Sequence, residues 1–285
     1  MLLNFTITLA EVIGGIFANS LSLLSDALHN FSDGLAIIIS YLAIKISSRA
    51  NDEKRTFGYR RASIMAAIIN ASVLIGISVF LFKEAYQKII HPHSINGGVV
   101  IWVALVGLVA NTLSVFLLQK GLKENLNIKS AYFHLLSDAL SSAGVVIGGI
   151  AIYYWRLYWI DPLLTIAISI YVLKESYGIL TQAINILMQG APSNINLDEI
   201  IAAIKKVAGV EQVHHVHLWS LDEQNINFEA HIDVKDMLVS KAEIICGQIA
   251  EALKEHGITH TTLQCECSGC KNVGIIKQPD ENCGH

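Results

Sequence analysis

The chain has 285 residues, of which 53% are hydrophobic and only 15% are charged, and its mean hydropathy is +0.48. Since soluble domains are typically about 25% charged, this composition argues against a wholly soluble protein. The formal net charge of −4 gives no reason to expect a nucleic-acid partner. Charges are sparse up to about residue 187 and reach ordinary density beyond Pro192, which predicts a membrane part followed by a soluble domain.

Six apolar segments approach the roughly 20 residues that a helix needs to cross a bilayer. They are residues 1–18, 24–46, 62–87, 98–119, 131–154 and 161–187. The first has neither the basic start nor the cleavage site of a secretory signal. Its shortness suggests a membrane span that has lost its front end. We therefore predict a six-helix membrane domain over residues 1–190.

Lys and Arg are distributed unevenly among the predicted connections and the span ends beside them. Six lie at the connection of the second and third spans, with Lys45 included, and three at that of the fourth and fifth, against three at the remaining connections, with Lys83 included. Because cytoplasmic loops carry the excess of these residues, both termini and the soluble tail are predicted to be cytoplasmic.

Ionisable side chains inside the spans are the main functional signal, because each costs at least about 2.5–3.5 kcal/mol on insertion scales. The second span contains HNFSD and the fifth contains HLLSD. Residues i and i+4 share one helix face, so each phrase offers an imidazole nitrogen and a carboxylate oxygen to the same side. Two such helices facing each other give a His₂Asp₂ set that fits tetrahedral Zn²⁺. The predicted ligands are His29, Asp33, His134 and Asp138.

Each phrase also has a structural interpretation, in which the His bonds a neighbouring carbonyl and the Asp caps a turn. The repetition of the phrase in two spans favours the metal site. Glu11, Asn70 and Asn111 are weaker candidates for the site, and the structural interpretation is favoured for each. Asp26 shares a face with His29, so it is either a gate or support for the site, or it belongs to the start of its helix.

Several residues of spans five and six are also assigned structural roles. Asp161-Pro162 opens the sixth span. Because Asp suits a helix N-cap and Pro suits the first turn, we predict that Asp161 caps its own helix. Gly144, Gly148 and Gly149 have the small-residue spacing that permits close helix contact.

The spacing of apolar residues in the soluble tail alternates between that of helices and that of strands. An amphipathic helix over LDEIIAAIKKVAG precedes two alternating strands, VHHVHLWSL and INFEAHIDV. A second helix over SKAEIICGQIAEALKEHG and a third strand, ITHTTLQCE, follow. This order predicts a small ferredoxin-like α+β domain over residues 191–270, with a flexible tail over 271–285. Cys246 lies in the apolar second helix and is predicted to be core.

Six phrases of this sequence occur together in one known family. They are NSLSLLSDALHNFSDG, FGYRRASIMAAIINA, AYFHLLSDALSSAGVVIGG, YWIDPLLTIAISIYVL, VHHVHLWSL and EAHIDV. In their order and positions the chain resembles the cation diffusion facilitator family of metal-ion/proton antiporters, specifically its zinc-transporting branch, over nearly its whole length. The resemblance implies a homodimer in the lipid bilayer of a bacterial inner or cell membrane. It also implies export of Zn²⁺, and of Cd²⁺ or Co²⁺ with it, from the cytoplasm in exchange for protons, with no prosthetic group.

The cysteines and histidines of the tail form a second candidate region. Cys267-x-x-Cys270 has the spacing of structural zinc sites, and a surface thiol pair is the alternative. Strand alternation places His231 and Asp233 on one polar face. The resemblance implies two adjacent zinc sites in the cytoplasmic domain, one formed by His214, His231 and Glu266, and the other by His260, Cys267 and Cys270.

Two other classes of protein share some of these features with an antiporter. An intramembrane metalloenzyme would use the same metal to activate water, but the chain has no H-E-x-x-H phrase, and two Asp with two His leave no open metal position. A membrane-anchored metal sensor would leave the paired ionisable residues of the spans without a purpose. The sequence therefore predicts a transporter and not an enzyme.

Overall fold

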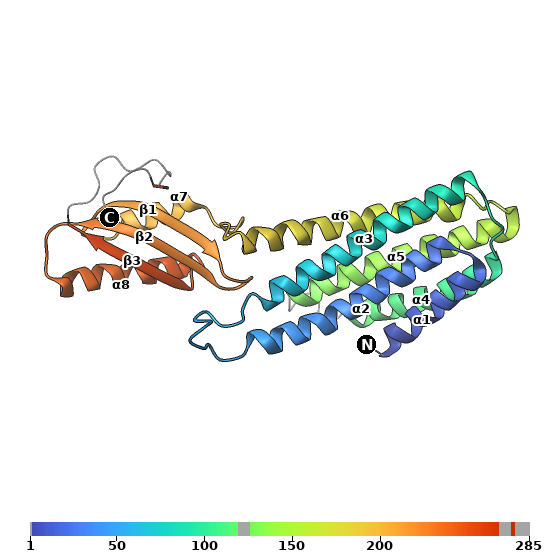
Figure 1. The fold of residues 1–285 in the computed structure, drawn as a ribbon, viewed down its shortest axis with the longest axis horizontal. Helices are drawn as coiled ribbons and strands as arrows, with labels where there is room; N and C mark the ends of the chain where they lie inside the picture. The colour runs from blue at the N-terminus through green and yellow to red at the C-terminus, as the bar shows by residue number, and fades with distance from the viewer. Residues whose placement is uncertain (1, 119–125, 268–274, 277–285) are drawn as a thin grey trace. The chain divides into compact units, whose positions relative to one another are not determined.

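The computed structural model describes residues 2–118, 126–267, 275 and 276, and its N-terminal part is built of α-helices (Figure 1). They are α1 (Leu2–Ala18), α2 (Leu21–Ser47), α3 (Ala62–Ile90), α4 (Gly97–Leu118), α5 (Leu126–Trp155) and α6 (Ile160–Leu187). The helices α2 to α6 are long and apolar enough to cross a membrane, while the apolar stretch found in α1, Phe5–Ala18, is shorter. The chain is thus a multi-pass membrane protein.

Large apolar side chains remain exposed on these helices. Phe17 of α1 is 80% exposed, and Trp102 and Leu117 of α4 are each 72% exposed. A helix satisfies its backbone hydrogen bonds within itself, so an apolar outer surface of this kind is suited to lipid.

Glycines of α5 allow two neighbouring helices to approach closely. An added Cβ at Gly148 would collide with Leu164 of α6, and one at Gly149 would lie 3.0 Å from Val100 of α4. The predicted packing role of these two glycines is confirmed, since only a residue without a side chain leaves this space.

The prediction that Asp161 caps its own helix is wrong. Asp161 instead caps the start of α2. Asp161 lies inside the first turn of α6. Its buried carboxylate accepts hydrogen bonds from the backbone N–H groups of Leu21, at 2.8 Å, and Ser22, at 3.2 Å. The hydroxyls of Ser20 and Ser22 donate to the same carboxylate. The first N–H groups of a helix have no partner within it, so an acid from another helix satisfies those of α2. This contact explains why α2 begins three residues earlier than predicted.

The C-terminal domain has two helices and a three-stranded sheet, in the order helix, strand, strand, helix, strand that the sequence predicts. Its elements are α7 (Leu197–Lys205), β1 (Val210–Ser220), β2 (Ile226–Val234), α8 (Val239–Glu255) and β3 (His260–Glu266). The strand β2 lies in the centre, antiparallel to β1 and parallel to β3.

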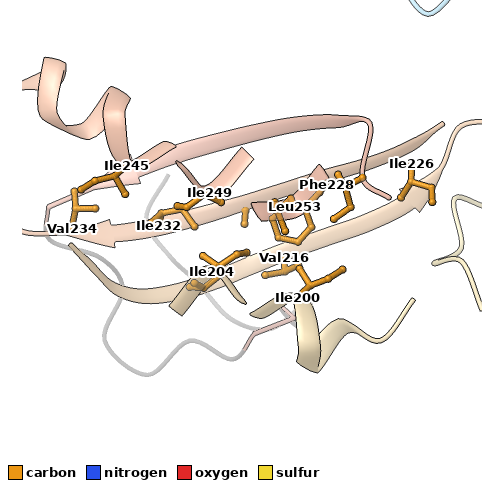
Figure 2. Packing of buried hydrophobic residues seen from close by; sticks show 13 residues of the cluster. Ile200, Ile204, Val216, Ile226, Phe228, Ile232, Val234, Ile245, Ile249 and Leu253 are labelled. Carbon is orange, nitrogen blue, oxygen red and sulfur yellow. The ribbon is translucent and has the colours of Figure 1, made fainter. Parts of the chain in front are cut away.

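The core of this domain lies between the sheet and its helices (Figure 2). Phe228 and Ile232 of β2 meet Ile200 of α7 and Ile249 and Leu253 of α8, and all five side chains are fully buried. These residues recur at period two in the strand and at helical spacing in the helices, so each element turns one apolar face inward.

The chain forms two compact units, residues 1–43 with 66–180, and residues 44–65 with 181–285.

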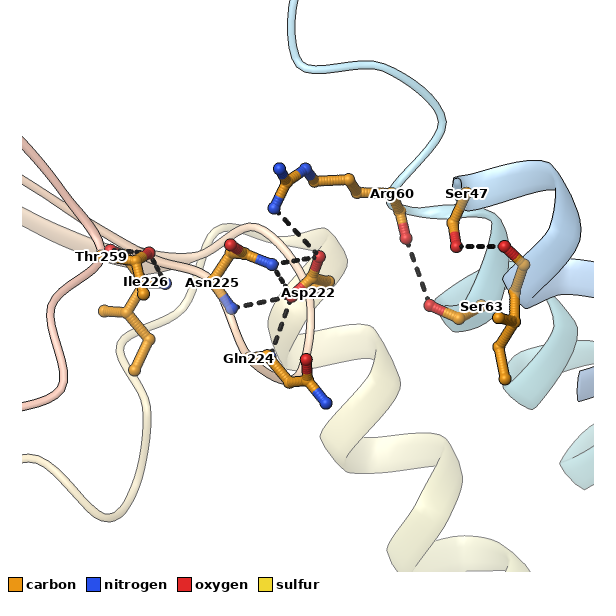
Figure 3. Close-up of polar contacts among 9 residues, drawn as sticks. Ser47, Arg60, Ser63, Asp222, Gln224, Asn225, Ile226 and Thr259 are labelled. Carbon is orange, nitrogen blue, oxygen red and sulfur yellow. Dashed lines mark hydrogen bonds and ion pairs between the residues drawn. The ribbon is translucent and has the colours of Figure 1, made fainter. Parts of the chain in front are cut away.

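In the second unit, the carboxylate of Asp222 orders the turn between β1 and β2 (Figure 3). It accepts hydrogen bonds from the backbone N–H groups of Gln224 and Asn225, and Arg60 lies 4.0 Å from it. Such Asx contacts are typical of Asp at a turn.

Candidate metal centres

The helices α2 and α5 bring three of the four predicted membrane ligands together. His29 Nε2 lies 3.3 Å from Asp138 Oδ1 and 3.6 Å from Asp33 Oδ2. One ligand atom from each residue fits within a group of atoms at most 4.8 Å apart. The His29 and Asp138 side chains are only 11% and 7% exposed. One imidazole and two carboxylates at this separation are suited to hold a divalent ion.

His134 lies one helical turn before Asp138 on α5, and its side chain falls outside the described residues. A cavity of about 360 Å³ borders this cluster. His29, Asp138 and Tyr171 of α6 are among the residues that line it. The cluster therefore has open space beside it, into which a small hydrated ion fits.

Asp26 lies in the interior of α2, five residues after the helix begins, so the interpretation that it belongs to the helix start is wrong. Its two carboxylate oxygens accept hydrogen bonds from the hydroxyls of Ser141, at 2.8 Å, and Ser142, at 2.9 Å, on α5. It is 1% exposed. These bonds join α2 to α5 one helical turn from His29 and Asp138.

The other polar residues of the spans make contacts within the bundle. Glu11 of α1 is fully buried and accepts a hydrogen bond from Asn30 of α2. Asn70 of α3 accepts a long hydrogen bond from Ser32, at 3.4 Å. The amide nitrogen of Asn111 has no hydrogen-bond partner among the described residues.

In the C-terminal domain, sheet register brings His214, His231 and Glu266 together. His214 of β1 pairs directly with His231 of β2, and Glu266 ends β3 next to it. Glu266 Oε1 lies 2.7 Å from His231 Nδ1, and Glu266 Oε2 lies 3.6 Å from His214 Nε2. His214 is buried and neither of its ring nitrogens makes a hydrogen bond within the described residues. A buried imidazole whose ring nitrogens make no hydrogen bond and lie near carboxylates fits a metal ligand.

Two neighbours of this cluster were not among the predicted site residues. Asp233 Oδ2 lies 3.7 Å from His214 Nδ1, and burial raises the pKa of the Asp233 carboxyl. Strand alternation had placed Asp233 on the same face as His231, which is the signal that pointed to it. His215 adopts a positive φ of 50° at an irregularity in β1, and its ring lies 4.5 Å from that of His231. Nothing in the spacing of apolar and polar residues along the sequence indicates this irregularity in β1.

The structure does not bring together the second predicted set in this domain. His260 begins β3 and Cys267 follows its end, while Cys270 lies outside the described residues. An extended strand rises about 3.3 Å per residue, so the two ends of β3 are about 20 Å apart. His260 and Cys267 of one chain therefore cannot bind the same ion, and the prediction of a shared site within a protomer is wrong.

Cys246 of α8 is half-buried against β3, so it belongs partly to the core as predicted. Its sulfur lies 2.8 Å from that of Cys265, and both are free thiols. Burial, together with the Cys246 thiol, raises the pKa of Cys265 to about 12.

Metal-binding side chains buried among membrane helices, with a second set in an attached α+β domain, define a membrane protein that handles metal ions. Residues 1–188 match the family model described as the cation efflux transmembrane domain. Residues 192–268 match the model of the cation efflux protein cytoplasmic domain. The chain belongs to the cation efflux family, whose members are transporters and not enzymes.

Curated relatives cover most of the chain. It is 37% identical to a "Cadmium, cobalt and zinc/H(+)-K(+) antiporter" of Bacillus subtilis, over 90% of this chain and 83% of the relative. It is 35% identical to the "Metal cation efflux system protein CzcD" of Cupriavidus metallidurans, over 95% and 86%. It is 34% identical to the "Zinc transporter ZitB" of Escherichia coli, over 92% and 84%.

Proposed function

We propose that this chain exports Zn²⁺ from the cytoplasm in exchange for protons, and that it accepts Cd²⁺ and Co²⁺ at the same site. The observation that carries the proposal is the contact of His29 with both Asp33 and Asp138 inside the membrane helices. The names of the relatives, which include cadmium, cobalt, zinc and protons, support this choice of substrates. Ligands of this N/O type do not discriminate strongly among these three ions.

The fourth ligand is His134, which shares a helix face with Asp138 because the two are four residues apart. Two carboxylates then offset the double charge of the ion in a low-dielectric site, and two imidazoles complete a tetrahedron.

The chemistry of these ligands couples metal to protons. Zn²⁺ needs neutral imidazole and ionised carboxylate, so binding of the metal releases protons and binding of protons releases the metal. The ordinary pKa of histidine, about 6.5, places this exchange near physiological pH. Alternate opening of the bundle to its two sides then makes the exchange an antiport.

The architecture that suits this function has six membrane spans, including the short α1, over residues 1–190. Both termini lie in the cytoplasm of a bacterial cell, since Lys and Arg concentrate in the α2–α3 and α4–α5 connections. Residues 191–270 form a ferredoxin-like cytoplasmic domain through which two copies associate, and residues 271–285 form a tail, most of which lies outside the described residues.

The C-terminal cluster binds a regulatory or structural Zn²⁺ through His214, His231 and Glu266. The ring nitrogens of His214, which make no hydrogen bond among the described residues, fit this role. Asp233 lies beside His214 and orients its imidazole. Cys267 binds metal only with ligands other than His260 of the same chain.

Reconstituted vesicles test the transport function. Zn²⁺ uptake driven by a pH gradient is expected in vesicles with the intact protein and is expected to be lost with Asp138→Asn, which keeps the size of the side chain but removes its charge. Ser114→Ala is the matched control, because the Ser114 hydroxyl donates a hydrogen bond to the backbone of Ala110 in its own membrane helix. Flux that ignores the pH gradient, or that survives Asp138→Asn, contradicts the proposal.

A further inference from the structure

Glu11 is a buried acid in the membrane bundle that does not belong to the metal cluster. It lies on α1 and is fully buried. An ionisable side chain inside a membrane is costly and usually has a function. Neither His29 nor the two acids of the cluster is among its hydrogen-bond partners, so metal binding by itself does not explain this residue.

The burial of Glu11 and the scarcity of hydrogen-bond donors around it favour its protonated form. Its Oε2 accepts one hydrogen bond from Asn30 Nδ2, at 3.1 Å, while Oε1 is buried without a hydrogen-bond partner among the described residues. No Lys or Arg in that part of the chain forms an ion pair with it. A buried carboxylate that has one donor and no counter-ion is expensive, whereas a neutral acid is not.

The groups that face Glu11 strengthen this preference. Asp26 of α2 is the ionisable residue whose charge acts on it, and α4 carries no ionisable side chain at all. Asp26 accepts two hydroxyl hydrogen bonds, whereas Glu11 accepts one from an amide, so Glu11 has fewer donors to stabilise a negative charge. Of these two acids, Glu11 is the one suited to carry a proton.

Space for the Glu11 carboxyl is built into α4. An added Cβ at Gly107 would collide with Glu11 Oε1, and it would lie 3.8 Å from Ser142 Oγ. Ser142 in turn donates to Asp26. Glu11 is thereby joined to α2 through Asn30, the neighbour of His29, and lies close to the hydroxyl that joins α2 to α5.

We propose that Glu11 binds a proton that is exchanged for the metal ion, at a site separate from the metal ligands. This rests on the proposed antiport. When Zn²⁺ binds to the cluster, its double positive charge favours the ionised form of Glu11, and the proton leaves Oε1 for bulk water. When the metal leaves, the negative charge of Asp26 disfavours the ionised form of Glu11, and a proton returns to its carboxyl from bulk water.

The number of protons released on Zn²⁺ binding tests this proposal. Titration of the purified full-length protein in weak buffer is expected to show fewer protons released by Glu11→Gln than by the intact protein, by up to one per chain. The pH dependence of Zn²⁺ affinity is expected to become shallower by about tenfold per pH unit for one proton lost. Gln resembles the protonated acid in shape and bonding, so this variant is expected to fold.

Two further variants separate the proton site from general damage. Gly107→Ala displaces the Glu11 carboxyl while leaving every metal ligand in place, and it is expected to reduce proton release as well. Ser114→Ala on the same helix is expected to leave proton release unchanged. Infrared difference spectra of the intact protein supply a measurement that needs no variant, since Zn²⁺ binding is expected to remove a protonated carboxyl band.

The outcomes distinguish this inference from the function on which it rests. If the intact protein neither binds nor transports Zn²⁺, the proposed function fails. If it releases protons on binding Zn²⁺ but Glu11→Gln releases the same number, only the role of Glu11 is refuted. If the infrared spectra show no loss of a protonated carboxyl band when Zn²⁺ binds, the role of Glu11 is also refuted. This result holds even if Glu11→Gln does not fold.

Discussion

Replacing Asp161 by Asn is expected to destabilise the membrane bundle without touching the metal cluster. Two backbone N–H groups and two hydroxyls donate to the Asp161 carboxylate, which is fully buried. The amide of Asn has one accepting oxygen, and its nitrogen can only donate. The oxygen accepts from at most two of the four donors, so two lose their acceptor.

The size of the effect follows from this count. A buried donor left without a partner costs about 1–3 kcal/mol. The two serine hydroxyls lie 3.2 Å apart and can turn toward each other, which relieves part of the loss. Removing a negative charge from the start of α2 adds about 0.3–1 kcal/mol. We therefore expect the free energy of unfolding to fall by about 2–4 kcal/mol.

Unfolding of the full-length protein in detergent micelles, followed during titration with a denaturing detergent, measures this change. Glu175→Gln is the matched control, because Glu175 lies on the same helix and is exposed. It is expected to change the free energy of unfolding by no more than about 0.5 kcal/mol. If Asp161→Asn is no more harmful than this control, the carboxylate does not hold the start of α2, and the reasoning is wrong.

Three further changes concern the C-terminal domain. Phe228→Ala, which empties a fully buried position, is expected to cost about 3–5 kcal/mol in the same unfolding assay, and a cost below that of an exposed substitution contradicts the packing described. Gly209→Ala is expected to cost about 1–3 kcal/mol, because Gly209 has a φ of 99° and an added Cβ would lie 2.7 Å from Ile245 Cδ1; unchanged stability argues against this backbone. A thiol reagent is expected to label exposed Cys267 well before Cys265, whose pKa of about 12 keeps it protonated. Mass spectrometry after labelling at about pH 7 and about pH 9 checks this, and a steep rise at Cys265 contradicts it.

The sequence was sufficient to predict the elements and the pairs of residues that share one element. The spans follow from apolar length, and the pairing of His29 with Asp33 follows from the helical repeat of 3.6 residues. The place of Asp233 beside His231 follows in the same way from the alternation of a strand. These relations are local, so they hold wherever the element packs.

Sequence reasoning failed where the answer depends on which elements meet. Asp161 has the features of a cap, and nothing local tells whose helix it caps. His260 and Cys267 are close in sequence and rich in metal-binding atoms, but an extended strand keeps its ends apart. The role of Asp26 was left open between a site and a helix start, and its contact with Ser141 and Ser142 decided that it lies inside the bundle.

By itself, the sequence determined that this is a multi-pass membrane protein with a His-x-x-x-Asp pair on each of two helices, because apolar length and helical period are properties of single segments. Only the tertiary structure decided that Asp138 faces His29, that His214 pairs with His231, and that Glu11 is buried beside Gly107. These contacts join residues distant in the chain, and their geometry is set by the packing of whole helices and the register of whole strands.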